Sequence, residues 1–231
     1  MSELFSIQLQ NRQQQGRDGV WLDLPTTTEQ VQAALRQIGI SSDNPQGLFI
    51  SGYFAEEEKR FAIPYNMVLA SNVDELNFLA ARLETLSTGE RAELNAALQA
   101  PQSELFSIGR ITDFPENVDY YVHLPDVRGP AQLGDYYLNR SGMVDMPEEW
   151  KGGIDTAQFG RYVAQQEQGV FNEYGYLVKS GDAWQKVHEG QPVPEEYRVL
   201  SFPAPEVLRD SANIPPPVQP ETEPQKVIPI I

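Results

Sequence analysis

Short alternating segments and one amphipathic helix are predicted in the first third of the chain. Residues 4–9 alternate between polar and apolar side chains, which predicts an edge strand with one buried face, and residues 20–24 predict a second strand. Thr26 and Glu29 have the spacing of a helix-capping box, so a helix is expected to follow. Its apolar face would consist of Val31, Ala34, Leu35 and Ile38. With a third strand beginning at residues 48–50, the pattern predicts a small β-β-α-β module.

Helical periodicity replaces strand alternation after residue 63. Ser71 with Asp74 predicts the start of one helix, and Ser87 or Thr88 predicts the start of a second. The buried face of the first helix would hold Leu76, Leu79, Ala80, Leu83 and Leu86. The outward positions of both helices are mainly acidic and include Glu75, Glu84, Glu90 and Glu93. We therefore expect a helical module with an acidic exterior.

A pair of packed helices is predicted between residues 132 and 171. The first covers residues 132–140 and ends at Gly142, because glycine tolerates the left-handed conformation that follows many helix C-termini. The second begins at Asp155, a residue type that caps helix N-termini, and ends before Gly169. Aromatic side chains at helical spacing occur in both segments, at Tyr136, Tyr137, Phe159 and Tyr162. They imply a shared apolar seam.

Short strands are expected on either side of this helical pair. Residues 108–111 and 120–124 are strand candidates, and residues 170–179 and 184–188 alternate around a Ser-Gly-Asp turn, which predicts a hairpin. The strands and the helical pair together predict a third, α+β module.

The fold class predicted from these patterns is α+β, built from three small modules and a tail. The modules would span residues 1–62, 63–105 and 106–190. Residues 191–231 contain ten of the eighteen prolines, and proline removes backbone donors and disfavours packed structure. We expect this tail to be extended and largely disordered, with residues 197–202 and 227–231 able to dock as short strands.

The net charge limits the kinds of partner that the protein is expected to bind. The 231 residues include 33 acids and 17 bases, a net charge of −16, which argues against ordinary DNA, RNA or anionic-membrane binding because those partners require a basic surface. Residues 61–126 are the most negative part, with ten acids and three bases. The acids are dispersed along predicted folded elements rather than gathered in one arm. A solvated acidic surface without further function is the alternative interpretation.

Catalytic and metal-binding signatures are scarce. The chain has no cysteine and two histidines, His123 and His188, without metal-ligand spacing. It contains no GxSxG elbow, no phosphate-binding glycine loop and no calcium-binding loop. We therefore predict that the protein is not an enzyme and uses no cofactor or metal. With no secretory signal and no membrane-spanning apolar run, the expected compartment is the cytoplasm.

Several short motifs resemble one known family. The YYLNRSG turn beginning at Tyr136, followed by Ile154-Asp155 and Phe159-Gly160-Arg161, is similar to the C-terminal signature of the ArdA antirestriction proteins. The VWLDL strand at residues 20–24 and the strand at residues 50–53 occur in the same order as in that family. The resemblance covers residues 20–179. The match rests on the order of these motifs as much as on any one of them.

The resemblance implies an elongated homodimer that imitates DNA and inhibits type I restriction-modification enzymes by occupying the DNA groove of their methyltransferase core. It implies a protein encoded on a mobile genetic element that does not bind nucleic acid itself. Residues 132–144 are similar to the family's antirestriction motif, which is associated with dimer contacts, so Tyr136, Tyr137 and Arg140 are the predicted interface residues. The predicted phosphate-mimicking carboxylates are Glu56, Glu57, Asp74, Glu75, Glu84, Glu90, Glu93, Asp113, Glu116, Asp119 and Asp126.

Two alternatives remain from the residues alone. An acidic adaptor could recruit a partner through its proline-rich tail, and a carboxylate-dependent hydrolase could use two of the 33 acids that converge in the fold. For the aromatic residues of the proposed interface, ordinary helix packing is the competing explanation. The triplet at residues 56–58 is followed at once by Lys59 and Arg60, which is also typical of a solvated loop.

Overall fold

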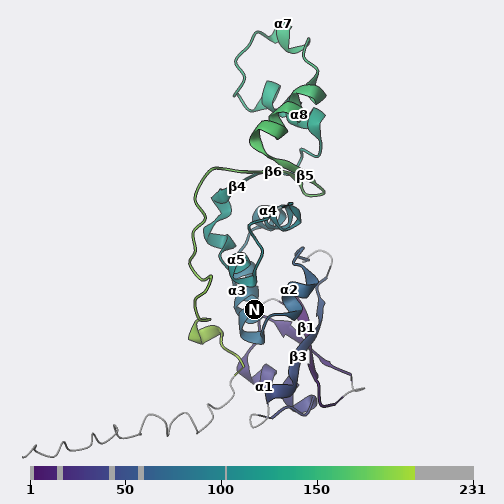
Figure 1. Ribbon diagram of the computed structural model, residues 1–231, viewed down its shortest axis with the longest axis vertical. Helices are drawn as coiled ribbons and strands as arrows, with labels where there is room; N and C mark the ends of the chain where they lie inside the picture. The colour runs from purple at the N-terminus through teal and green to yellow at the C-terminus, as the bar shows by residue number, and fades with distance from the viewer. Residues whose placement is uncertain (1–2, 15–17, 42–44, 57–59, 102, 201–231) are drawn as a thin grey trace, which may run out of the picture. The chain divides into compact units, whose positions relative to one another are not determined.

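Eight α-helices and two antiparallel sheets make up the described part of the chain (Figure 1). The computed structural model describes residues 3–14, 18–41, 45–56, 60–101 and 103–200. These residues all belong to one compact unit, residues 1–201. The α+β fold class is confirmed, whereas the division into three modules stays a prediction. None of the helices in the described ranges has the length and apolar character needed to cross a membrane.

The first sheet has the order β2-β1-β3 and is antiparallel throughout. Its strands are β1 (Phe5–Asn11), β2 (Val20–Leu24) and β3 (Leu48–Phe54). The prediction that β1 is an edge strand was wrong: β1 pairs on both sides, and its Ser6 lies opposite Asp23 on β2 and Phe54 on β3. Alternation along one strand reports its buried face but not its position in the sheet.

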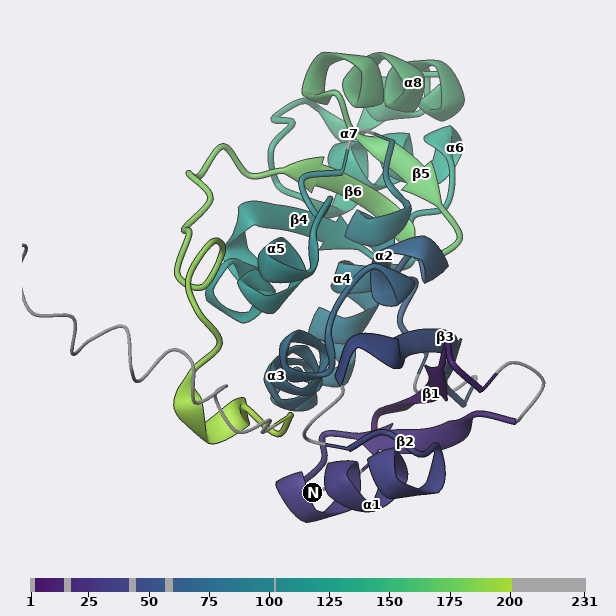
Figure 2. The same cartoon turned by 60° about the horizontal axis from the view of Figure 1, so that its bottom comes forward.

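Helix α1 (Thr28–Gln37) packs beside β2 (Figure 2). Its capping box joins Thr27 and Gln30, one residue later than predicted, because two successive threonines precede the helix and both are able to cap it. Gly39 follows the helix with a positive φ of 68°, a conformation that glycine adopts readily at helix C-termini. The buried side chains of the helix are those predicted from periodicity, Val31, Ala34 and Leu35.

The next three helices are α2 (Tyr65–Leu69), α3 (Val73–Glu84) and α4 (Thr88–Gln99). Helix α3 is capped by Asn72 with Glu75, rather than by Ser71 with Asp74 as predicted. Helix α4 is capped by Ser87 with Glu90, which confirms the prediction. Two buried asparagines on these helices bind loop backbone. Asn77 accepts the Thr26 N–H at 2.7 Å, and Asn95 accepts the Ala62 N–H at 2.8 Å.

The second sheet has the order β4-β6-β5 and contains β4 (Tyr121–Leu124), β5 (Val170–Asn172) and β6 (Gly175–Lys179). The hairpin is formed by β5 and β6, so the prediction that residues 184–188 form one of its arms was wrong. Residues 108–111 were also wrongly predicted as a strand. They belong to helix α5 (Ile108–Thr112), which Ser107 caps by accepting the Arg110 N–H.

Two helices cross in direct backbone contact near the second sheet. They are α6 (Pro130–Asp135), which continues into a π-helical turn (Tyr136–Arg140), and α8 (Thr156–Glu167), which Asp155 caps as predicted. A Cβ atom at Gly134 would overlap the Thr156 carbonyl oxygen, and one at Gly160 would overlap the Pro130 carbonyl oxygen. The core beneath the crossing contains Val127, Leu133, Ala164 and Tyr176. The short helix α7 (Glu148–Lys151) lies in the connection.

Residues 180–200, here called the C-terminal strap, return along α5 and α3. Tyr197 packs on the ring of Phe78, and Val199 is 4% exposed. The first ten residues of the predicted disordered tail are therefore folded, with a short 3₁₀ turn at Glu195–Tyr197 in place of a strand. The rest of that tail, including residues 227–231, lies outside the described residues.

Candidate functional site

The predicted phosphate-mimicking carboxylates differ widely in exposure. Glu56, Asp119 and Asp126 are exposed, whereas Asp113 is fully buried and so does not belong to the surface. Glu57 lies outside the described residues. The half-buried members are Asp74, Glu75, Glu84, Glu90, Glu93 and Glu116.

Two half-buried members cap helices. Glu75 accepts the Asn72 N–H at 3.3 Å, and Glu90 accepts the Ser87 N–H at 2.7 Å. The hydrogen bonds from Ser87 lower the pKa of Glu90, so its negative charge is stabilised at the N-terminus of α4. The positions of both side chains are therefore fixed by the helices that they cap.

Asp74 and Asp113 anchor the C-terminal strap. Asp74 Oδ1 accepts the Val199 and Leu200 N–H groups at 2.8 and 2.7 Å. Asp113 accepts three strap N–H groups, from Val187, His188 and Glu189, at 2.6 to 3.3 Å. Their charges are thus directed at the backbone of the same chain. The sequence offered no sign of this, because the strap lies more than 70 residues beyond each carboxylate.

Glu116 pairs with Arg82 across two elements, which neutralises one of the three basic residues in the most acidic part of the chain. Glu84 is half-buried, and Arg91 donates to its backbone carbonyl oxygen at 3.4 Å. Glu116 therefore contributes less outward charge than an unpaired surface carboxylate would.

Glu93 lies in an unusual environment. Burial, together with the nearby charges of Glu90 and Asp119, raises its pKa to about 8. Its Oε1 atom is buried and has no hydrogen-bond partner within the described ranges. Near neutral pH, Glu93 is consequently protonated in a large fraction of molecules and does not act as a full negative charge.

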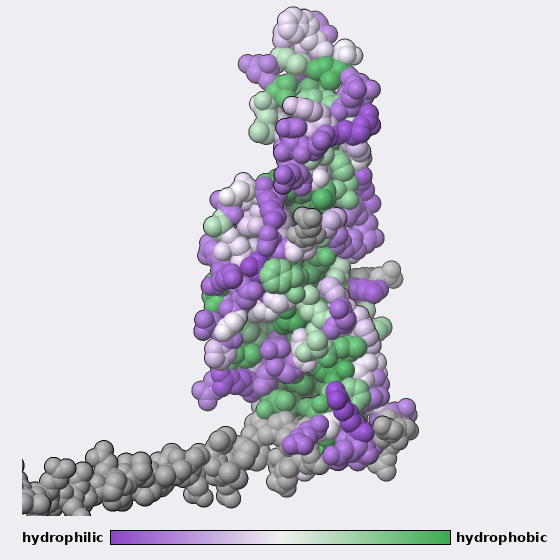
Figure 3. Space-filling model, viewed as in Figure 1, coloured by the Kyte–Doolittle hydropathy of each residue, from purple (hydrophilic) through white to green (hydrophobic). Residues whose placement is uncertain are grey.

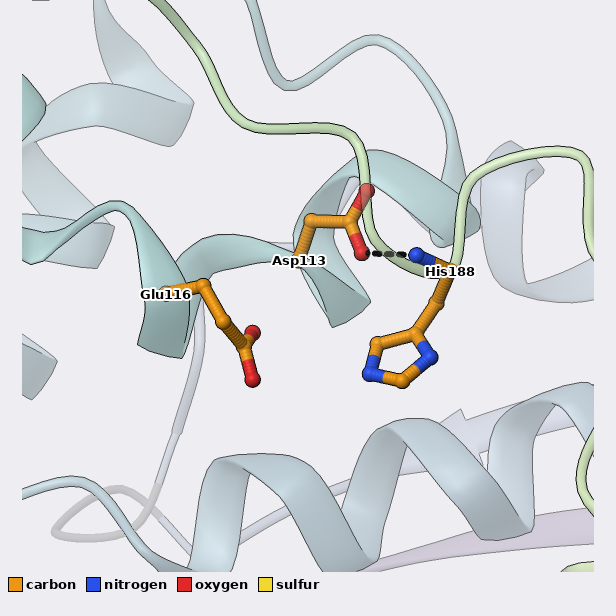
Figure 4. A group of neighbouring side chains, drawn as sticks. All are labelled: Asp113, Glu116 and His188. Carbon is orange, nitrogen blue, oxygen red and sulfur yellow. Dashed lines mark hydrogen bonds between the residues drawn. The ribbon is translucent and has the colours of Figure 1, made fainter.

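Asp113, Glu116 and His188 bring possible ligand atoms within 4.8 Å of one another (Figure 4). The donor set suits a metal poorly, because Asp113 already accepts three N–H groups and Glu116 is paired with Arg82. The His188 ring instead contacts the edge of Phe78, with ring centroids 4.9 Å apart. The arrangement is best explained as the anchor of the strap.

Further exposed acids lie outside the predicted set. Fifteen Asp and Glu side chains are exposed in the described residues, against nine Lys and Arg side chains. The exposed acids outside the predicted set are Glu3, Asp18, Asp23, Glu29, Asp145, Glu148, Glu149, Asp155, Glu173, Asp182, Glu195 and Glu196. The cluster from Asp145 to Asp155 could have been recognised, because it occupies a polar connection between two predicted helices.

Several bases are paired with acids of the same chain. Arg110 contacts Glu104 at 3.0 Å and Glu189 at 3.1 Å, and it is 9% exposed. The other pairs are Arg82 with Glu116, Arg140 with Asp135, Lys151 with Glu148, Lys179 with Glu104, and Lys186 with Glu189. Within the described residues, six bases are therefore offset by acids of the chain itself.

The predicted interface residues are largely engaged within the chain. Tyr137 donates its hydroxyl to Glu167 at 2.5 Å, and Tyr176 donates to the other oxygen of Glu167 at 2.8 Å. Tyr136 packs partly on the core beneath the helix crossing. Arg140 is exposed, lies 5.8 Å from the Tyr136 ring centroid and pairs with Asp135.

The family model described as antirestriction protein (ArdA) matches residues 15–178. The chain belongs to the ArdA family. Comparison with curated proteins gives no match. Membership supports a general antirestriction function and interaction with restriction-modification enzymes. ArdA proteins act without catalysis, which is consistent with the prediction that this chain is not an enzyme.

The ArdA match also locates the strap relative to the family. It ends at residue 178, within β6, so the strap follows the matched region. The side chains that anchor the strap, including Asp74, Asn77, Asp113 and Asn117, all lie inside the matched region. The strap is thus held by residues of the matched region.

Proposed function

We propose that this ArdA chain inhibits type I restriction-modification enzymes by occupying the DNA-binding groove of their methyltransferase core, with surface carboxylates in place of DNA phosphates. The observation that carries the proposal is the charge arrangement on a member of an antirestriction family. Exposed acids outnumber exposed bases in the described residues, and six bases pair with acids of the chain. A groove lined with Lys and Arg would attract such a surface over a distance set by the salt concentration.

The number of charges is adequate for a short duplex. Two copies of residues 1–190 carry 54 acids and 28 bases, a net charge of −26. At two phosphate charges per base pair, this corresponds to about 13 base pairs. Pairing within the chain leaves this net charge unchanged, because each pair engages one acid and one base. A mimic that is already curved would also avoid the energy that DNA needs to bend.

The homodimer belongs to this proposal. We expect the interface in the region of Tyr136, Tyr137 and Arg140, although the Tyr137 hydroxyl is engaged with Glu167. Additional apolar surface in this part of the chain comes from Met143, Trp150 and Tyr162, which are 74%, 68% and 59% exposed. Burial of these side chains by a second copy would be favourable at about 25 cal/mol per Å² of apolar surface.

A competition assay tests the mimicry. The protein would be titrated into a type I endonuclease reaction at several concentrations of an uncleavable duplex that contains the target site. If the proposal is right, inhibition weakens as the duplex concentration rises, because both occupy the same groove. Inhibition that does not depend on the duplex would contradict it.

Two charge-matched triple variants test which acids matter. Glu56→Gln, Asp119→Asn and Asp126→Asn together remove three exposed charges of the ArdA-matched region. Asp182→Asn, Glu195→Gln and Glu196→Gln remove three exposed charges of the strap. We expect the first triple to weaken inhibition more than the second. Equal losses would mean that total charge, and not position, determines inhibition.

Deletion of residues 202–231 separates mimicry from the adaptor alternative. The deletion keeps the strap, which is anchored to the rest of the chain. A mimic would retain most of its inhibition, whereas an adaptor that recruits its partner through the tail would lose it.

A further inference from the structure

Two large aromatic side chains are exposed on the first sheet. Trp21 on β2 is 49% exposed and Phe54 on β3 is 57% exposed, although the central strand β1 separates their strands. Their rings meet edge to face with centroids 6.5 Å apart. Hydrophobic groups also gather in the lower part of the face drawn in Figure 3, where Figure 1 places β1 and β3.

The sheet register explains how the two rings meet. Gln8 on β1 lies opposite both Trp21 and Gly52, so the three residues form one row across the sheet. The indole of Trp21 extends along this row, and a Cβ atom at Gly52 would lie 3.0 Å from Trp21 Cη2. Because Gly52 has no side chain, the indole can reach β3.

The floor beneath the rings is polar and hydrogen-bonded. Ser6 lies opposite Asp23 and Phe54 in the next row, and its hydroxyl donates to Asp23 at 2.8 Å. Ser51 donates to the Gln8 side chain at 3.0 Å. The rings therefore lie on the outer face of the sheet, opposite the core side chains Phe5, Ile7 and Leu9 of β1. This surface, Trp21 with Phe54, is called the aromatic pair below.

Acidic groups surround the aromatic pair. Glu3 and Glu56 line a shallow hollow together with Phe54, and Asp23 is the neighbour of Phe54 across Ser6. All three carboxylates are in exposed residues. An apolar centre with an acidic rim is complementary to a basic protein surface that contains an apolar hollow, because aromatic residues form the energetic centre of many interfaces and the rim sets charge preference.

We propose that the aromatic pair is an apolar anchor that inserts into the basic DNA-binding groove of the restriction-modification enzyme. This inference rests on the proposed function and adds a contact that DNA phosphates do not supply. Carboxylate contacts weaken as salt rises, whereas burial of aromatic surface depends little on salt. The anchor would therefore hold the inhibitor in the groove at salt concentrations at which charge alone binds weakly.

The salt dependence of binding distinguishes the contribution of the aromatic pair from that of the carboxylates. The full-length chain with Trp21→Thr and Phe54→Thr would be compared with the original chain by the dissociation constant for the type I enzyme at several salt concentrations. Threonine keeps the preference for strand structure. We expect binding to weaken about 10- to 100-fold at every salt concentration, with the slope of log K against log salt unchanged. The carboxylate triple Glu56→Gln, Asp119→Asn and Asp126→Asn should reduce the slope instead.

Two controls make the outcome decisive. Phe106→Thr removes another exposed aromatic side chain, which is 64% exposed, and should leave binding unchanged. Urea unfolding of each variant shows whether the first sheet is intact, and the single variant Phe54→Thr serves if the double variant unfolds. Full-strength binding by folded anchor variants, or an equal loss with Phe106→Thr, would overturn the anchor. Failure of the original chain to compete with duplex would instead reject the proposed function, and the anchor with it.

Discussion

The carboxylate of Asp113 accepts the backbone N–H of His188 at 2.6 Å, although 75 positions separate the two residues. Asp113 is fully buried and also accepts the N–H groups of Val187 and Glu189. Buried carboxylates are costly unless such bonds satisfy them. Asp113, directly after α5, thus holds three consecutive residues of the strap.

Asp113→Asn should therefore destabilise the fold. The amide has one acceptor oxygen and directs an NH₂ group at an N–H donor, so we expect a loss of about 2–3 kcal/mol in the free energy of unfolding. Urea denaturation measures this loss, and hydrogen exchange at residues 187–189 should accelerate. Asp126→Asn, at an exposed aspartate, is the control and should change stability by less than about 0.5 kcal/mol. Equal stability of the two variants would contradict the role of Asp113 in holding the strap.

Substitution at the helix crossing should also destabilise the protein. Gly134→Ala or Gly160→Ala places a methyl group against backbone carbonyl oxygens of the opposite helix, which cannot yield as a flexible side chain would. We expect each change to cost about 1–3 kcal/mol or more. Gly89→Ala in α4 is the matched control, because no atom lies within 4 Å of its new Cβ, and it should stabilise by about 0.4–1 kcal/mol. Thermal unfolding of the three variants compares them directly.

Glu93→Gln should stabilise the protein in a pH-dependent manner. Burial raises the folded-state pKa of Glu93 to about 8, so the folded protein binds a proton that the unfolded chain releases above about pH 4.5. Glu93 therefore costs progressively more stability as pH rises from 4.5 to 8. After allowance for partial exposure, we expect the variant to gain on the order of 1–2 kcal/mol at pH 8 and almost nothing at pH 4.5. Urea denaturation at both pH values gives the comparison, and a gain that is equal at both would contradict it.

Glu167→Gln should weaken the contact between α8 and the second sheet. The carboxylate accepts the hydroxyls of Tyr137 and Tyr176, and burial together with these bonds raises the pKa of both tyrosines. Their contribution to stability is present below about pH 10, the ordinary tyrosine pKa, and is lost as pH rises above it. We expect a loss of about 1–3 kcal/mol at neutral pH. Spectrophotometric titration should show two tyrosines that ionise later in the original chain than in the variant.

Local signals in the sequence predicted most element boundaries. Asp155 is a strong capping residue at its position and caps α8 as predicted, and Ser87, one of the two residues predicted to begin α4, is its cap. The two shifted caps arose where neighbouring residues compete, Thr26 with Thr27 and Ser71 with Asn72. Residues 108–111 were mistaken for a strand because a short apolar run fits either structure, and the Ser107 cap decides for a helix.

Long-range bonds account for what the sequence could not predict. The alternation in residues 184–188 was assigned to a hairpin, yet Asn117 and Asp113 bind this backbone from elsewhere in the chain. The exposure of each carboxylate also depends on distant parts of the chain, so local sequence could not predict it. A helical position indicates an outward direction for Glu93, but it does not indicate which other element covers that side.

The strap also constrains how the length of this chain can change. Asn77, Asp113 and Asn117 are at most 4% exposed and use their polar atoms on strap backbone. A chain that ended after β6 would leave the side chains of Asn77, Asp113 and Asn117 without their partners on the strap backbone. We therefore expect a chain truncated after β6 to be less stable, because these buried side chains would lose hydrogen bonds that the strap now provides.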